Sequence, residues 1–281
     1  MKVKPTKLAV LATEQPNRRS ANLDLLSTRK LLQTINREDA TVAAAVKKSL
    51  PQIEILVGAV VERLVNGGRL FYIGAGTSGR LGCVDASEMP PTFGVSPSLV
   101  QGIMAGGKTA LTRSREGAED DGRAGILDIA HRRVGLKDVV VGLSASGRAR
   151  YVQQALAKAQ RSGAYTACIT CNRNSALIAC AEVAIVAETG PEVVTGSTRM
   201  KAGTAQKMIL NMISTASMVR LGRVKGNRMV HLQIKCEKLL ERAVNLVVEE
   251  TGVSSVAARK ALKKSSGSVT AAVVALKTIL R

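Results

Sequence analysis

The sequence predicts an α/β fold, a three-layer sandwich in which helices cover both faces of a central, mostly parallel sheet, followed by a small C-terminal helical bundle. Three observations support this prediction. Short apolar runs alternate with helical patterns over most of the chain. These runs are continuously apolar, which is typical of parallel strands buried on both faces. The 281 residues are enough for one large α/β domain and a small appendage.

The part of the chain before the first strand is predicted to be helical. Residues 1–20 are basic and polar, and we expect part of them to be disordered or wrapped on a partner. Leucines at helical spacing predict one or two helices over residues 22–48. Pro51 is expected to open the next helix, and Gly67 and Gly68 to end it. Residues 1–50 are therefore expected to form an N-terminal helical arm.

The remaining elements define an α/β domain over residues 51–232 and a small helical domain over residues 233–281. Strands are expected at residues 69–73, 99–105, 138–143, 164–170 and 181–187. Helices are expected from the first glycine-rich turn to Glu88, over residues 108–121, 125–133 and 150–161, and from Arg199 onward. Pro90 and Pro91 should end the first of these helices, because proline cannot continue a helix. Breaks near Gly252 and Gly267 predict three short helices in the basic tail.

Three turns at the carboxyl ends of expected strands combine glycine with hydroxyl side chains. Their candidate ligand-binding residues are Gly76, Thr77, Ser78, Ser144, Ser146, Gly147, Ser197 and Thr198. Ligands of open α/β sheets bind at this edge, and the amides at a helix N-terminus suit a phosphate. The first turn alone would fit an ordinary strand-to-helix connection equally well, since it has neither a Walker lysine nor the dinucleotide glycine spacing. Three such turns on one edge favour a phosphate pocket.

Composition narrows the classes of partner. The net charge of +20 would suit nucleic acid, an acidic surface or an anionic substrate, or could be a general surface property. The basic residues are spread along the chain and aromatic residues make up only 2%, which argues against a nucleic-acid partner. No apolar run is long enough for a membrane span, and the one near the N-terminus is too short for a signal peptide.

The cysteines do not form a metal-binding pattern. They lie at positions 83, 168, 171, 180 and 236. Cys168 and Cys171 are separated by two residues but have no second pair of ligands downstream, and His131 and His231 are distant in sequence. We therefore expect no metal site, and interpret the thiols as buried or idle groups in a reducing cytoplasm.

Several long runs resemble the N-acetylmuramic acid 6-phosphate etherases, a branch of the sugar isomerase (SIS) domain proteins. The similar runs are residues 23–28, 72–82, 85–88, 90–94, 116–121, 190–199 and 201–207. They occur in the family's order, and the resemblance extends from about residue 13 to the end. It implies an SIS-type fold with residues 51–232 as the phosphosugar-binding domain, no metal or other cofactor, and a homodimer. Lys207, at the end of the last run, joins the candidate phosphate-binding residues.

The resemblance also implies a reaction. The family cleaves the D-lactyl ether at C3 of N-acetylmuramic acid 6-phosphate by elimination and then hydration, giving N-acetylglucosamine 6-phosphate and D-lactate. Glu88 matches the family's proton donor and Glu119 its other acid/base residue. Elimination needs a base for the C2 proton and an acid for the leaving oxygen, and two carboxyl groups in different environments can divide these roles. Without the resemblance, Glu88 would be interpreted as a carboxylate at a helix end, and Glu119 as part of a solvated acidic cluster.

Glu88 is expected to lie far from the first glycine-rich turn. It lies ten residues beyond Ser78, about 15 Å along a helix at ~1.5 Å per residue. A single sugar phosphate would not easily bridge that distance. We therefore expect Glu88, held partly dry beside Pro90 and Pro91, to complete the pocket of a twofold-related subunit.

One departure from the family pattern follows the second turn. Family members usually have Thr-Pro where this chain has Ala149 and Arg150. The lost hydroxyl would remove about 1 kcal/mol of hydrogen bonding to phosphate, and Arg150 would either compensate for it or face solvent. The alternatives to an etherase are a non-catalytic phosphosugar-sensing regulator and an isomerase. The two glutamates favour an enzyme, and the acidic runs around them favour an etherase over an isomerase.

Overall fold

The computed structural model describes residues 11–230, 234 and 237–279. The first ten residues of the expected arm, His231 and Cys236 lie outside this part of the chain. The chain divides into two compact units, one made of Met1–Ala86 with Ser98–Ser214, the other of Ser87–Pro97 with Thr215–Arg281. The helices α4 (Gly76–Phe93) and α7 (Lys201–Arg220) each contribute residues to both units.

A five-stranded parallel sheet forms the centre of the first unit. Its strands are β1 (Leu70–Gly74), β2 (Val100–Met104), β3 (Val139–Leu143), β4 (Tyr165–Thr170) and β5 (Val183–Val186). Their order across the sheet is β2-β1-β3-β4-β5, and every neighbouring pair is parallel. Every residue of β1 and β3 is buried, which is why these two strands are continuously apolar in sequence. The predicted sheet is confirmed.

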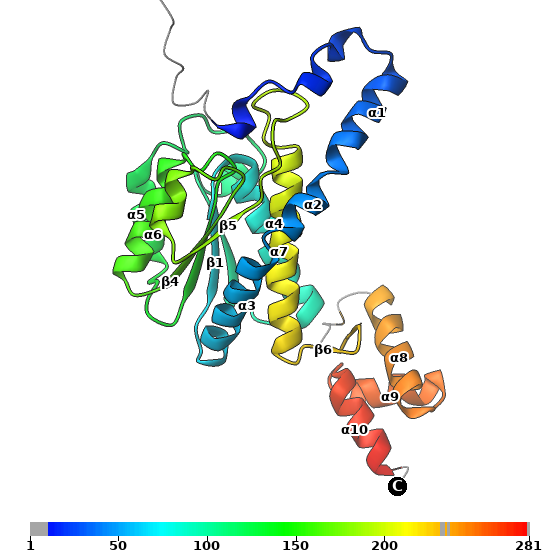
Figure 1. Ribbon diagram of the computed structural model, residues 1–281. Coiled ribbons are helices and arrows are strands. Elements are labelled where there is room, and N and C mark those ends of the chain that lie inside the picture. The colour runs from blue at the N-terminus through cyan, green and yellow to red at the C-terminus, as the bar shows by residue number, and fades with distance from the viewer. Residues whose placement is uncertain (1–10, 231–233, 235–236, 280–281) are drawn as a thin grey trace, which may run out of the picture. The chain divides into compact units, whose positions relative to one another are not determined.

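Helices cover both faces of this sheet (Figure 1). On one face, α5 (Gly122–His131) and α6 (Arg150–Arg161) pack together, and α6 contacts β1, β3 and β4. The apolar side of α6 joins one core with Phe71, Ile73 and Val140. On the other face lie α3 (Leu50–Val65) and the parts of α4 and α7 that belong to the first unit. The three-layer α/β prediction is therefore correct.

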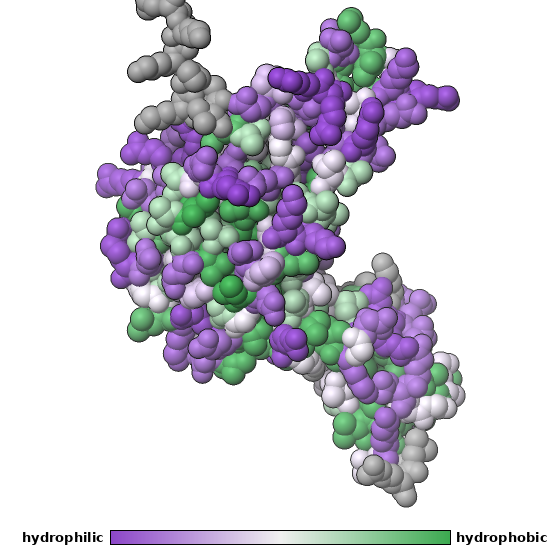
Figure 2. All heavy atoms as spheres, in the orientation of Figure 1, coloured by the Kyte–Doolittle hydropathy of each residue, from purple (hydrophilic) through white to green (hydrophobic). Residues whose placement is uncertain are grey.

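The segment before α3 is tied to the sheet by side-chain bonds to its carboxyl edge. It contains α1 (Thr28–Asp39) and α2 (Val42–Lys47), preceded by three short 3-10 helices (Ala12–Glu14, Arg18–Ser20 and Leu23–Leu25). Ser20 Oγ donates to the Val193 carbonyl at 2.8 Å, and Ser49 Oγ to the Val186 carbonyl at 2.8 Å. Hydrophilic side chains cover the outer surface of α1 (Figure 2).

Two helix predictions are wrong in ways that bear on the site. The expected helix over residues 108–121 is a 3-10 helix at Lys108–Leu111 followed by turns, because Gly117 adopts a φ of +72° that a helix does not allow. The helix expected to end at Glu88 continues through Pro90 and Pro91 to Phe93. Its last turn is closed by a bond from Gly94 N to the Pro90 carbonyl, and Met89 and Phe93 bury their side chains. The burial of these two side chains offsets the loss of the backbone hydrogen bonds that the two prolines cannot donate.

The second unit contains the three helices predicted for the tail. They are α8 (Glu237–Thr251), α9 (Ser255–Lys264) and α10 (Val269–Ile279), which share a small aliphatic core centred on Val247, Ala258 and Ala272. A short hairpin, β6 (Val224–Lys225) and β7 (Arg228–Met229), was not predicted. Its signal is the Gly226-Asn227 turn, a pair that favours tight hairpins. Over the described residues, no helix combines the length and apolarity needed to cross a bilayer.

Candidate active site

The turn between β1 and α4 brings the helix N-terminus against the strand end. A Cβ added to Gly74 would lie 2.7 Å from the Gly79 nitrogen, and one added to Gly79 would lie 2.5 Å from the Gly74 carbonyl oxygen. Both positions therefore require glycine. Gly76 adopts a φ of +55°, and the first helical bond runs from Gly79 N to the Ala75 carbonyl. The amides of Gly76, Thr77 and Ser78 precede that bond, as the free donors of a helix N-terminus do.

The turn after β3 is held by a convergence of bonds on one carbonyl. The Ala145 oxygen accepts from Cys171 N at 3.0 Å, Thr170 Oγ1 at 3.1 Å and Asn172 Nδ2 at 2.9 Å. Gly147 N donates to Ser144 Oγ at 3.0 Å, and Arg148 N to Ser146 Oγ at 3.3 Å. These bonds fix the turn, so its two serines occupy defined places at the sheet edge.

The turn before α7 is capped from within by a buried carboxylate. Glu192 is fully buried, and its two oxygens accept from Lys201 N at 3.0 Å and Ala202 N at 2.9 Å. Burial raises the pKa of Glu192 despite these bonds. The first amides of α7 are therefore already occupied. An anion at this turn would have to use the hydroxyls of Ser197 and Thr198, whose side chains are half-buried.

A buried ionic cluster lies behind this turn, and no local pattern in the sequence predicts it. Lys201 Nζ contacts Glu38 Oε2 at 2.8 Å, and both side chains are 1% exposed. Asn17 Nδ2 donates to the same oxygen at 2.9 Å, and Arg19 Nε lies 2.7 Å from Glu38 Oε1. Burial would raise the pKa of Glu38, but these partners together outweigh it and lower the pKa. The cluster ties the N-terminal segment to the start of α7.

The three turns meet around the first residues of α7. A Cβ at Gly203 would lie 3.4 Å from Thr77 Cγ2 and 3.5 Å from the Thr198 carbonyl oxygen, so the first and third turns adjoin. Ala145, Cys171 and Ala202 pack together, which places the second turn against the same helix end. Convergence was predicted from the topology, and the contacts among the turns agree with it.

Lys207 lies apart from the three turns. It is exposed on α7, six residues beyond Lys201 and about 9 Å further along the helix at ~1.5 Å per residue. With the Asn211 amide turned so that its oxygen faces the lysine, that oxygen accepts from Lys207 Nζ at 2.8 Å and its nitrogen donates to Asp85 Oδ1 at 3.3 Å. Ser214 Oγ also donates to Asp85 Oδ1, at 3.0 Å. Lys207 thus belongs to a polar cluster between α4 and α7.

Glu119 is one of the residues that line a cavity of about 190 Å³ beside the first turn. The cavity is lined by Ala75, Gly76, Arg80, Met104, Ala105, Ala110 and residues 114–119. The Glu119 carbonyl accepts from Tyr151 N at 2.9 Å, which anchors its backbone to the first turn of α6. The Glu119 residue is exposed to solvent, yet desolvation by its surroundings raises the pKa of its carboxyl, and the charges of Asp120 and Glu116 raise it further. Such a group is a stronger base than an ordinary carboxylate and is suited to proton transfer.

Glu88 belongs to the second unit, whereas Glu119 belongs to the first. Glu88 is on α4 and is exposed in the single chain, so the expectation of a partly dry carboxyl is not met within one subunit. Ala149 is the N-cap residue of α6 and offers no side-chain bond to the helix. Arg150 is exposed, and both alternatives considered for it stay predictions.

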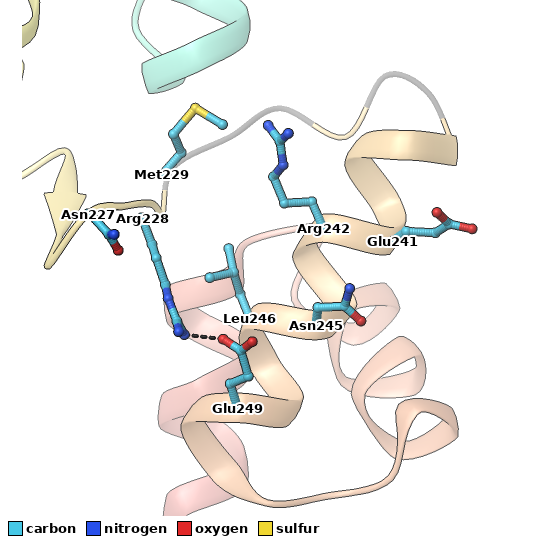
Figure 3. Close-up of a pocket in the computed structure, with 8 residues that line it drawn as sticks. All are labelled: Asn227, Arg228, Met229, Glu241, Arg242, Asn245, Leu246 and Glu249. Atoms are coloured by element: carbon cyan, nitrogen blue, oxygen red, sulfur yellow. Dashed lines mark hydrogen bonds and ion pairs between the residues drawn. The ribbon is translucent and has the colours of Figure 1, made fainter.

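The cysteine thiols and a second hollow contain none of the site residues that were predicted from the sequence. Cys83, Cys168, Cys171 and Cys180 are free, and the described residues contain no group of three His, Cys, Asp or Glu arranged to hold a metal ion. A hollow of about 590 Å³ lies in the second unit between the β6–β7 hairpin and α8. Figure 3 shows Arg228 and Glu249 paired across it. No pattern in the sequence predicts this hollow.

Comparison with known proteins identifies the domain. Residues 52–160 match the glucokinase regulatory protein N-terminal SIS domain, and residues 128–216 match the SIS domain. A phosphoheptose isomerase from Neisseria gonorrhoeae superposes with a TM-score of 0.53 at 14% identity, over 68% of this chain and 99% of its own. One from Francisella tularensis gives a TM-score of 0.51 at 15% identity, over 67% and 98%. These structures share the fold, so the SIS-type prediction is confirmed.

Much closer relatives are named N-acetylmuramic acid 6-phosphate etherase. The one from Symbiobacterium thermophilum is 54% identical over 266 residues, covering 95% of this chain and 88% of the relative. The one from Geobacillus thermodenitrificans is 50% identical, covering 94% and 90%, and one from Bacteroides fragilis is 49% identical, covering 94% of each. The similarity extends far beyond the matched domains and includes the helical tail. The chain therefore belongs to the N-acetylmuramic acid 6-phosphate etherase family.

Proposed function

We propose that this protein is a carbon–oxygen lyase that cleaves the D-lactyl ether of N-acetylmuramic acid 6-phosphate, giving N-acetylglucosamine 6-phosphate and D-lactate. The observation that carries the proposal is Glu119, a carboxyl of raised pKa that lines a cavity next to the first of the three hydroxyl-rich turns. The names of relatives about 50% identical over nearly the whole chain support the same reaction. A role in the catabolism or recycling of cell-wall amino sugars, in the cytoplasm, is part of the proposal.

The reaction divides into elimination and hydration. Glu119, as the base, removes the C2 proton of the sugar, and the electron pair forms a double bond to C3 as the C3–O bond breaks. Glu88, as the acid, gives its proton to the leaving ether oxygen, which departs in D-lactate. Water then adds to C3 and gives one proton to Glu88, while Glu119 returns its proton to C2, so both carboxyl groups end in their starting protonation states. Atoms and charge balance without a cofactor.

The phosphate is proposed to bind at the three turns. The free amides at the start of α4 and the positive end of its dipole attract an anion, and Thr77 and Ser78 add hydroxyls beside them. Ser144, Ser146 and Gly147 supply the second turn, and Ser197 and Thr198 the third. Since Glu192 already occupies the first amides of α7, the amide donors are expected to come from α4. Lys207, which lies further along α7, is proposed as a more distant phosphate-binding residue.

A homodimer with shared sites is proposed as the working assembly. Glu88 is exposed on the part of α4 that belongs to the second unit, so it is free to face another subunit. In this arrangement the arm of residues 1–50, the phosphosugar domain of residues 51–232 and the tail of residues 233–281 are the functional parts. Mixing Glu88→Gln subunits with Ser146→Ala subunits tests the sharing. Mixed dimers should regain part of the activity that each parent lacks, and no regain would contradict shared sites.

The direct test is release of D-lactate from N-acetylmuramic acid 6-phosphate by the purified protein. Lactate should appear in step with N-acetylglucosamine 6-phosphate, and Glu119→Gln should lose activity by about 10²-fold or more, the usual contribution of a general base. In heavy-oxygen water, the hydration step should place the label at C3 of the sugar and not in lactate. Tight binding of hexose phosphates without any lactate release would favour the phosphosugar-sensing regulator instead.

A further inference from the structure

The cavity beside Glu119 is lined by two chemically distinct sets of residues. Its apolar lining residues include Met104, Ala105, Ala110 and Ala118. Its basic lining residues come from two separate parts of the chain, Arg80 on α4 and Arg115 in the turns before Glu119. A pocket that pairs small apolar residues with two cations is suited to a small organic acid that has a short aliphatic part.

Backbone carbonyls hold the two guanidinium groups in place. Arg80 Nε donates to the Leu111 carbonyl at 3.1 Å, and Arg115 Nη1 donates to the Gly106 carbonyl at 3.3 Å. Each of these bonds uses one of the five N–H donors that a guanidinium carries. Among the described residues, neither arginine forms an ion pair with a carboxylate. Their charges are therefore positioned in the cavity but not neutralised by direct pairing.

The acidic residues that line the cavity do not cancel its preference for a small organic acid. Glu116 accepts from Ser114 Oγ at 2.9 Å, and both Glu116 and Glu119 line the cavity. Two arginines and two glutamates make the lining neutral as a whole, so it does not repel an incoming anion. The guanidinium donors, which can bind a carboxylate through two parallel bonds, then supply the attraction.

We propose that this cavity is the subsite for the lactyl group, with Arg115 and Arg80 binding its carboxylate and the alanines contacting its methyl group. The assignment rests on the proposed function. It follows from what the leaving group carries, which is one carboxylate, one methyl group and the ether oxygen next to the reacting carbon. The volume of about 190 Å³ equals roughly six liquid waters at ~30 Å³ each, enough for a three-carbon acid. Placing this group here brings the neighbouring C2 and C3 carbons of the sugar toward Glu119, the proposed base, while the phosphate lies at the turns.

The experiment compares two substrates that differ only in the charge of the lactyl group. One is N-acetylmuramic acid 6-phosphate, and the other is the same compound with the lactyl carboxylate converted to its neutral amide. The wild type should prefer the acid, as measured by kcat/KM. Arg115→Gln should lower kcat/KM for the acid by about 10- to 100-fold, the loss expected for one hydrogen-bonded charge partner, and leave the amide nearly unchanged. Arg80→Gln should act in the same direction.

The control variant is Arg113→Gln. Arg113 is exposed on the same segment but does not line the cavity, so neither substrate should respond to its change. Equal losses on acid and amide in Arg115→Gln would mean that the arginine only supports the fold, and the subsite assignment would be overturned while the proposed function stands. A wild type that cleaves neither substrate would overturn the proposed function, and this assignment with it.

Discussion

Replacing Lys201 by methionine tests how the buried ionic cluster holds the site together. Lys201 and Glu38 are each 1% exposed and lie 2.8 Å apart, so the change leaves a buried carboxylate without its principal partner. Breaking such a pair costs about 3–5 kcal/mol. Asn17 and Arg19 still contact Glu38, which places the expected cost near the lower end, about 3 kcal/mol. At roughly 2–4 °C per kcal/mol for a chain of this size, the melting temperature of the first unit should fall by about 6–12 °C.

Thermal melts near pH 7, followed by circular dichroism, measure this effect. The double variant Glu38→Gln/Lys201→Met has no buried charge left and keeps a hydrogen-bond acceptor for Asn17, so it should recover most of the loss. A Lys201→Met melting temperature within about 2 °C of the wild type would refute a stabilising role for the pair, since it would correspond to less than about 1 kcal/mol.

Acidification gives an independent check with a defined sign. The pKa of Glu38 is lowered in the folded protein, so its contribution is complete above the ordinary carboxyl pKa and is lost as pH falls through the lowered value. Methionine at position 201 removes the largest lowering partner. The difference in melting temperature between wild type and Lys201→Met should therefore shrink as pH falls from neutral into the acid range. A difference that grows on acidification would show that Glu38 is not held ionised by Lys201.

Three further changes probe the site. Ala149→Thr places a capping side chain at the N-terminus of α6, where the native residue makes no such bond. The variant should be more stable by about 1 kcal/mol in thermal melts and should have a lower KM for the sugar phosphate. An unchanged KM would exclude contact between this residue and the phosphate. Glu116→Gln removes a charge that raises the pKa of Glu119, so the acid limb of the kcat/KM profile should move to lower pH, whereas a shift upward would contradict Glu119 as the base. Gly147→Ala should destabilise the second turn by about 1–3 kcal/mol and raise KM, because the residue has a φ of +72° and its Cβ would lie 1.6 Å from Ser175 Oγ. A KM equal to that of the wild type would show that this turn does not belong to the binding site.

The sheet was predictable because its signal is local. Five short apolar runs, each followed by a helical pattern, allow little besides a parallel sheet with covered faces. The position of the three turns follows from that topology, since all parallel strands end at one edge. For this reason Thr77 and Thr198, more than a hundred residues apart in sequence, were expected to adjoin, and the contacts around Gly203 agree.

Residues that act through long-range pairing could not be found this way. Glu38 and Lys201 are separated by 163 positions and carry no local pattern, so nothing in the sequence marks them as a buried pair. Glu192 looks like an ordinary loop carboxylate until the fold places it over the first amides of α7. In each case the role of the side chain depends on a partner that is distant in sequence, and the periodicity of the sequence does not predict such partners.

The segment from Lys108 to Asp121 shows why a failed helix prediction can mark a site. Its composition suits a helix with one acidic face, yet an α-helix would carry Arg115 and Glu119 on consecutive turns of the same regular surface, with no hollow between them and α4. The observed turns instead bond to three other elements, through Arg115 to the Gly106 carbonyl, through Arg80 to the Leu111 carbonyl and through Glu119 to Tyr151 N. Those bonds outweigh a helix propensity of a few tenths of a kcal/mol per residue. They also leave the open space that α4 and these turns enclose, so the same tertiary contacts that override the local preference create the cavity that Glu119 lines.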